Sequence, residues 1–280
     1  MRIVRDAAGN ELPRAPSQEA WDRLSERERA AVLASLPSEF ELEAQPPEGD
    51  PHRKPKQSAY EALDAYFRRI GRRVYLSSEL PVYYPDEPVF APDLIAVLDV
   101  EPHDRMHWVV SAEKRGIDFA LEIHVAGDRN KDFTRNVEWF ARLGIPEYFA
   151  FDAPRKRLVG YRLATPAGRV YQPIIPQGGV WSSRVLGLDL AVEEGRLRWL
   201  HGTVPLADAR ELIARLGSMV DDAVARAEES ARRAEEEARR AEEEARRAEE
   251  EARRAEEGAR RAERLAAKLR ALGVDPDADD

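Results

Sequence analysis

The chain has 280 residues, five histidines, no cysteine and a formal net charge of -9 at pH 7. The absence of cysteine excludes disulfides, thiolate nucleophiles and thiolate zinc sites, which leaves carboxylates and histidines as metal ligands. Oxygen ligands suit Mg²⁺ or Mn²⁺. No stretch approaches the roughly 18 uninterrupted apolar residues that a membrane span needs, so we expect a cytoplasmic protein with no membrane partner.

The negative charge is unevenly distributed along the chain. Residues 221–280 hold 14 Lys+Arg against 20 Asp+Glu, whereas the residues before them are close to balanced. A small negative total does not exclude DNA as a partner, because carboxylates can be reserved for a metal while a local basic rim meets phosphate. The charge gives DNA binding no positive support either.

Residues 1–50 are expected to form a lead-in to the main domain. The sequence Ser25-Glu26-Arg27-Glu28 has the spacing of a capping box and predicts a short helix that ends near Leu36, before Pro37. Prolines at positions 46, 47, 51 and 55 predict an irregular linker or surface loop from Glu41 to Pro55.

An amphipathic helix is predicted from Lys56 to Ile70, where apolar residues recur at helical spacing and Gly71 follows in the position of a C-terminal cap. This helix should lay its apolar stripe on a sheet. Glu61 falls off the stripe, so it is either a solvated carboxylate or a third carboxylate that the helix brings to a metal site.

Two central strands carry the candidate site. The wholly apolar run Leu94–Leu98 predicts a strand covered on both faces. The segment 117–125 alternates, so Glu122 and His124 point to the same side of their strand. The connection between the two strands contains no obvious crossover helix, which favours antiparallel pairing and brings Asp93 against Glu122.

The flanking segments complete the expected sheet. Residues 72–78 alternate like an outer strand. A helix after Asp128 ends at Gly144, and the strand Glu147–Asp152 follows it, which predicts a parallel crossover unit. A hairpin then leads to further short strands up to about Leu200. The predicted fold class is α/β, with a mixed central sheet flanked by helices.

The last segment predicts one long helix over residues 207–273, roughly 100 Å in length. Within it the unit Ala-Arg-Arg-Ala-Glu-Glu-Glu repeats as a heptad. Two interpretations stay open: residues 220–272 form a coiled-coil homodimer along the alanine seam, or the helix stands alone and is stabilised by Glu and Arg pairs four residues apart. An acidic tail, residues 274–280, follows.

The chain resembles the Uma-two type family of restriction endonucleases, which belongs to the PD-(D/E)XK nuclease superfamily. The resemblance covers roughly residues 50–200, and its motifs are moderately specific through their order and spacing. They are Pro92-Asp93, Glu122-Ile123-His124, Asp128 to Lys131, Gly144-Ile145-Pro146-Glu147-Tyr148 and Asp152. The resemblance implies a restriction-endonuclease-like domain over residues 51–206 that hydrolyses DNA with a divalent metal.

The resemblance also implies the metal ligands. Asp93 and Glu122 would hold Mg²⁺ or Mn²⁺ together with a main-chain carbonyl near Ile123. A buried, unpaired Glu122 would cost several kcal/mol. The structural alternative for Glu122 is therefore an ion pair with Arg135 or Lys131.

The lysine that normally completes such a site is displaced. His124 stands two residues after Glu122, where lysine is usual, and Asn136 occupies the helical position from which family members often supply it. Lys131 is the nearest cation along the chain, and His124 shares a face with Glu122 as a base or ligand. Lys131 and His124 are thus the remaining candidate catalytic residues.

Two other functions compete with cleavage. One is a catalytically weakened nuclease fold that acts as an assembly module through its coiled coil, and the other is a nucleic-acid binder without cleavage. The remaining histidines are not expected in the site, because none has a partner at ligand spacing that a helix would align. They are His52, His103, His107 and His201.

Overall fold

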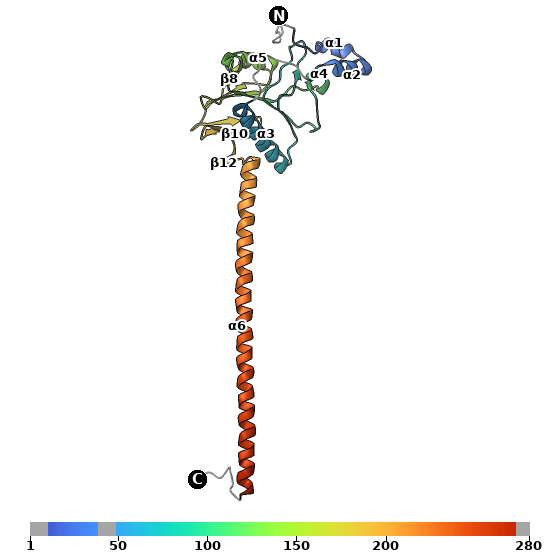
Figure 1. Ribbon diagram of the computed structural model, residues 1–280. Coiled ribbons are helices and arrows are strands. Elements are labelled where there is room, and N and C mark those ends of the chain that lie inside the picture. The colour runs from blue at the N-terminus through green and yellow to red at the C-terminus, as the bar shows by residue number, and fades with distance from the viewer. Residues whose placement is uncertain (1–10, 39–48, 273–280) are drawn as a thin grey trace. The chain divides into compact units, whose positions relative to one another are not determined.

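The structure, a computed structural model, describes residues 11–38 and 49–272 (Figure 1). The chain divides into two units, Met1–Leu212 and Ile213–Asp280. All the strands that the structure describes lie in the first unit, and the described part of the second unit is helical. Most of the predicted proline-rich linker and the acidic tail 274–280 lie outside the described residues.

A six-stranded mixed sheet forms the centre of the first unit, in the order β1-β3-β5-β6-β7-β8. Only β5 and β6 pair in parallel, as the predicted crossover unit requires, and the other neighbours are antiparallel. The strands are β1 (Val74–Ser77), β3 (Leu94–Leu98), β5 (Phe119–His124), β6 (Glu147–Asp152), β7 (Arg157–Leu163) and β8 (Tyr171–Pro173). The mixed α/β class is thereby confirmed.

Two smaller sheets accompany the central one. Four short antiparallel strands are ordered β12-β11-β10-β9, and β2 pairs with β4 in parallel. Their bounds are β9 (Val180–Ser183), β10 (Leu188–Glu193), β11 (Arg196–His201), β12 (Val204–Pro205), β2 (Val82–Tyr83) and β4 (Trp108–Val109). The series of short strands expected up to about Leu200 is thus present.

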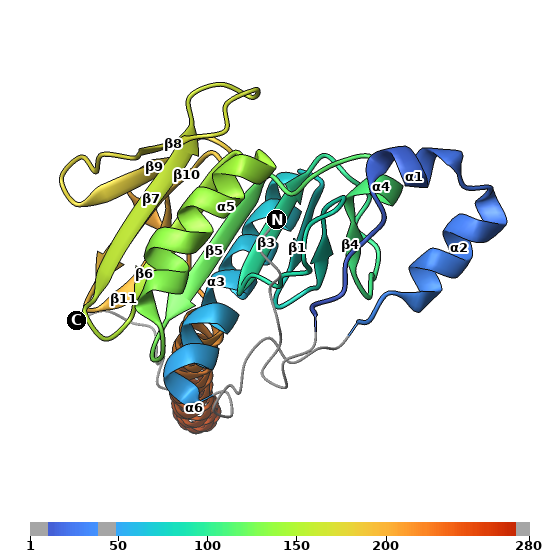
Figure 2. The ribbon, with the colours of Figure 1, turned by 90° about the horizontal axis from the view of Figure 1, so that it is seen from above.

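Helices cover both faces of the central sheet (Figure 2). The apolar stripe of α3 (Asp50–Ile70) packs with β10 and β11 on one face, and α5 (Asn136–Leu143) packs on the other. A π-helical turn, η1 (Lys131–Arg135), leads directly into α5. The smaller helices are α1 (Gln18–Arg23), α2 (Glu26–Ser35) and α4 (Val110–Glu113), and α2 begins with the predicted capping box.

Helix α3 begins at Asp50, so the irregular segment predicted to reach Pro55 was wrong over its last residues. Pro51 lies in the first turn, where backbone N–H groups have no intrahelical acceptor and proline is tolerated. Pro55 removes one helical hydrogen bond. The buried stripe that includes Leu63 and Phe67 compensates for this loss through apolar burial.

The buried carboxylate of Glu147 joins the central sheet to the second sheet. It accepts hydrogen bonds from the Ser183 hydroxyl at 2.5 Å and from the Arg184 N–H at 2.9 Å, and Arg162 lies 3.1 Å away. Because Glu147 is only 2% exposed, these partners offset its desolvation. The glutamate of the Gly-Ile-Pro-Glu-Tyr turn is therefore structural.

The predicted long helix is present as α6 (Ala209–Ala271). Its glutamates and arginines form exposed ion pairs four residues apart, among them Glu243 with Arg247 at 2.8 Å. Such pairs contribute a few tenths of a kcal/mol each. Among the residues that the structure describes, no helix has both the length and the apolar composition needed to cross a membrane.

Candidate metal centre

Asp93 and Glu122 meet at the ends of neighbouring strands. Antiparallel pairing places Leu94 of β3 opposite Leu121 of β5, and Asp93 directly precedes β3. The Asp93 N–H donates to Glu122 Oε2 at 3.4 Å, and the Ile123 N–H donates to Asp93 Oδ2 at 2.6 Å. Both side chains are buried. The expected pairing of these two residues is confirmed, while their metal role stays a prediction.

The surroundings of Glu122 disfavour its charge. Burial raises the pKa of Glu122 well above its usual value, and the neighbouring charge of Asp93 raises it further. The positive charge of Lys131 opposes this shift. Two neighbouring buried carboxylates are costly to ionise together unless a cation shares them. Such perturbed pairs of carboxylates are common at functional sites.

His124 pairs with a residue that the sequence did not suggest. Its Nδ1 lies 3.0 Å from Oδ2 of Asp132, and both side chains are buried. The Tyr148 hydroxyl donates to the Asp132 carbonyl at 2.8 Å and fixes the π-helical turn η1. Burial raises the pKa of Asp132. π-helical turns often occur at functional sites, because they place one side chain out of helical register.

Asn136 occupies the position where the resemblance places a lysine. Its Nδ2 donates to Glu122 Oε1 at 3.2 Å from the first residue of α5. The half-buried Lys131 comes from η1, near enough for its charge to lower the pKa values of Glu122 and Asp132. Arg135, the alternative ion-pair partner, instead pairs with Asp128 at 2.9 Å.

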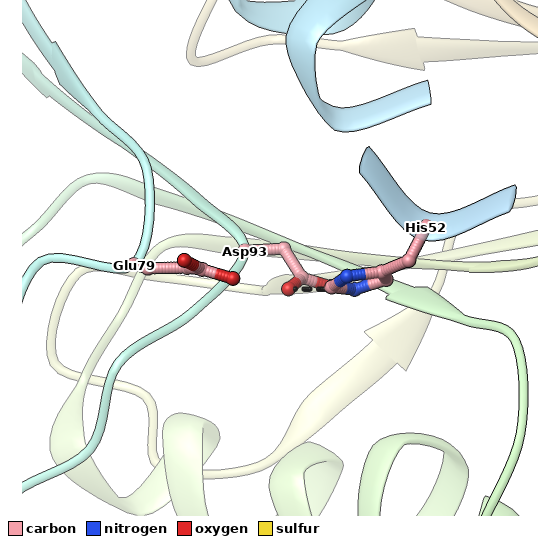
Figure 3. A group of neighbouring side chains, drawn as sticks. All are labelled: His52, Glu79 and Asp93. Atoms are coloured by element: carbon pink, nitrogen blue, oxygen red, sulfur yellow. Dashed lines mark ion pairs between the residues drawn. The ribbon is translucent and has the colours of Figure 1, made fainter. Parts of the chain in front are cut away.

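A second group of side chains surrounds Asp93. His52 Nε2 of α3 lies 3.0 Å from Asp93 Oδ1, and Glu79, in the loop after β1, approaches Asp93 from another side (Figure 3). One ligand atom from each of these three residues lies within 4.8 Å of the others. Lys56, four residues after His52, lies 2.5 Å from Glu79 Oε1.

The structure thus brings His52, which was not expected in the site, next to Asp93, while a functional role for it stays untested. His52 was left out because no partner stands at ligand spacing along the sequence, and Glu79 and Asp93 are distant from it in the chain. A helix that begins at Asp50 puts His52 and Lys56 on one face, and that spacing was the available signal. Glu61, considered as a possible third carboxylate from the same helix, instead accepts a hydrogen bond from Gln57 at 2.8 Å.

A mixed β-sheet between helices, with two buried carboxylates where neighbouring strands meet, is the arrangement that the resemblance to restriction-endonuclease-like proteins implies. The model of the Uma2 family, described as "Putative restriction endonuclease", matches residues 36–193, and the chain belongs to this family. A crystal structure of a putative nuclease belonging to DUF820, from Anabaena variabilis, is 12% identical with a TM-score of 0.40, and the match covers 51% of this chain and 76% of that one. No curated protein matches the chain.

Proposed function

We propose that this protein is a divalent-metal-dependent endonuclease that hydrolyses phosphodiester bonds of DNA. The observation that carries the proposal is the buried pair of Asp93 and Glu122, joined through the Asp93 N–H. Carboxylate oxygens, together with the main-chain carbonyl near Ile123 that the family resemblance implies, are hard donors, which fit Mg²⁺ or Mn²⁺. When bound, such an ion supplies Lewis acidity that activates water and offsets charge on the phosphodiester oxygens.

Residues beside the pair would handle the proton and the charge. The ring of His124 is held through Nδ1 by Asp132, which leaves Nε2 to accept a proton from the attacking water if Nδ1 carries the hydrogen. The charge of Lys131 favours the ionised form of Glu122. In this proposal His124 is the base and Lys131 keeps the metal-binding carboxylate charged.

Plasmid cleavage tests the proposal directly. The purified protein is incubated with supercoiled DNA and Mg²⁺ or Mn²⁺, beside Asp93→Asn and Glu122→Gln. We expect each variant to lose roughly 100-fold or more of the activity, since each removes a charged metal ligand. Glu61→Gln on the outer side of α3 is the matched control. Equal cleavage by the wild type and both site variants would indicate a contaminating nuclease and refute the proposal.

A second candidate function is assembly through α6, favoured by its exposed apolar side chains. The spacing of the alanine seam continues into Ile213, Val220 and Val224 at one end and Leu269 at the other, and these four residues are between 37% and 69% exposed. Apolar residues at alternating three- and four-residue spacing are the contact positions of a coiled coil. The seam is thus suited to a partner helix.

Charge beside the seam decides which partner fits. In the three central repeats the two positions that flank the seam are both glutamates, as with Glu235 and Glu237, while the arginines lie on the far side. A second copy would set glutamate against glutamate in either orientation, which disfavours the homodimer through residues 220–272. We expect a helix flanked by lysine or arginine to bind better. Sedimentation of the full-length chain tests whether the homodimer forms. A dimer that is lost on truncation before Val220 would show that the chain does pair with itself through this helix.

A further inference from the structure

We propose that His52, Glu79 and Asp93 form a second cation site, which takes a transition-metal ion such as Mn²⁺ in preference to Mg²⁺. The site lies beside the Asp93 and Glu122 pair and shares one residue with it. The inference goes beyond the proposed endonuclease function, because it concerns other ligands and holds whether or not the protein cleaves DNA.

Three separate parts of the fold bring the ligands together. His52 lies in the first turn of α3, Glu79 in the loop after β1, and Asp93 directly before β3 (Figure 3). Their ligand atoms lie within 4.8 Å of one another. Donors about 2.1 Å from one ion are at most about 4.2 Å apart, so small side-chain rotations suffice to close the site.

The two oxygens of Asp93 face different partners. Oδ2 accepts from the Ile123 N–H at 2.6 Å, on the side of Glu122, whereas Oδ1 lies 3.0 Å from His52 Nε2. The Asp93 carboxylate is thereby held in one orientation, with Oδ1 directed towards the second site. One residue can therefore serve both sites through different oxygen atoms.

Glu79 is fixed beside Asp93 by its backbone and by Lys56. Its N–H donates to the carbonyl of Pro92 at 3.0 Å, and its φ of 53° is a conformation that L-residues rarely adopt. The buried Lys56 contacts Oε1 at 2.5 Å. Ligating carboxylates are commonly oriented by such outer partners. Lys56 therefore orients the Glu79 carboxylate through Oε1.

The donor set determines the choice of ion. Two carboxylate oxygens alone would suit Mg²⁺, which binds nitrogen poorly, whereas imidazole favours transition-metal ions. Mn²⁺ accepts both donor types, and its unpaired electrons report a bound nitrogen. Mn²⁺ is therefore both an ion that the site is expected to bind and the probe that tests the site.

Pulsed electron paramagnetic resonance on Mn²⁺-loaded, full-length protein without DNA tests the site. We expect nitrogen-14 modulation from a bound imidazole in the wild type, and a loss of that modulation in His52→Gln together with at least roughly 10-fold weaker Mn²⁺ binding. Glu79→Gln should weaken binding similarly. It also keeps the test informative if His52→Gln does not fold, because Glu79 lies at the surface, with a side chain 51% exposed.

Two matched controls separate this site from its neighbour. His124→Gln removes the other buried histidine, and Glu122→Gln removes the other metal carboxylate, so both should retain the nitrogen signal. The inference is overturned if the wild type shows no nitrogen modulation, if His52→Gln keeps it, or if His124→Gln loses it. If the signal is present but plasmid DNA is not cleaved, the endonuclease proposal fails while the second site stands.

Discussion

Asn136 Nδ2 donates a hydrogen bond to Glu122 Oε1 at 3.2 Å, from the helical position where the family resemblance places a lysine. The amide holds the carboxylate in place but supplies no charge. Burial raises the pKa of Glu122, and an uncharged neighbour does little to oppose that shift. This one contact connects the displaced lysine with the cost of ionising Glu122.

Restoring the lysine should raise activity. Asn136→Lys would place a cation beside Glu122, favouring the ionised carboxylate and helping to position the attacking water, so we expect roughly 10-fold faster plasmid cleavage. Thr134→Lys adds the same charge at an exposed position of η1 and is the control. If both variants cleave DNA at the same rate, the lysine position is irrelevant to this site.

Removing the charge of Lys131 should shift the pH profile of cleavage. Lys131 lowers the pKa of Glu122, so Lys131→Met should raise that pKa and move the acid limb of the rate profile to higher pH. Lys131→Arg keeps the charge and should leave the limb near its wild-type position. Rates measured from pH 5 to 9 with Mn²⁺ decide between these outcomes, and an unmoved limb in Lys131→Met would contradict the role given to Lys131.

Glu122 should make the metal-free protein less stable as pH rises. Because burial raises the pKa of Glu122 above 4.5 in the folded state, the unfolded chain releases this proton first. The free energy of unfolding is therefore highest, as far as Glu122 is concerned, below about pH 4.5, where Glu122 is protonated in both states. It falls as pH rises through the pKa of Glu122 in the folded protein. Glu122→Gln removes this dependence.

Thermal unfolding in chelator from pH 4 to 8 measures the difference. We expect Glu122→Gln to be more stable than the wild type at pH 8, with the gap closing towards pH 4. Added Mn²⁺ should stabilise the wild type more than the variant, because the cation then shares the ionised carboxylate. If stability depends on pH in the same way for the two proteins in chelator, the pKa of Glu122 is not raised in the folded state.

The link between the two sheets predicts a large stability effect. Glu147→Gln leaves Arg162 beside an uncharged partner in a buried position, and we expect a loss of about 3 kcal/mol in the free energy of unfolding. Glu194→Gln breaks an exposed pair with Arg196 and should change stability by less than about 0.5 kcal/mol. Urea unfolding compares them, and similar losses for both variants would exclude a structural role for Glu147.

The sequence determined the features that repeat at short range. Alternation along β5 places Glu122 and His124 on the same face, and the connection from β3 without a long helix predicts antiparallel pairing, so Asp93 meets Glu122. The heptad of α6 is equally local, and the helix ends close to the predicted bounds. Strand and helix periods are properties of neighbouring residues, so they are visible without a three-dimensional structure.

Only the tertiary structure brings His52 to Asp93, Asp132 to His124 and Asn136 to Glu122. Each contact joins segments whose meeting depends on where a helix crosses the sheet and how its first turn is wound. The early start of α3 moves His52 into the site, and the π-helical turn directs Asp132 inwards. Such placements depend on packing between distant parts of the chain, for which a local residue pattern holds no information.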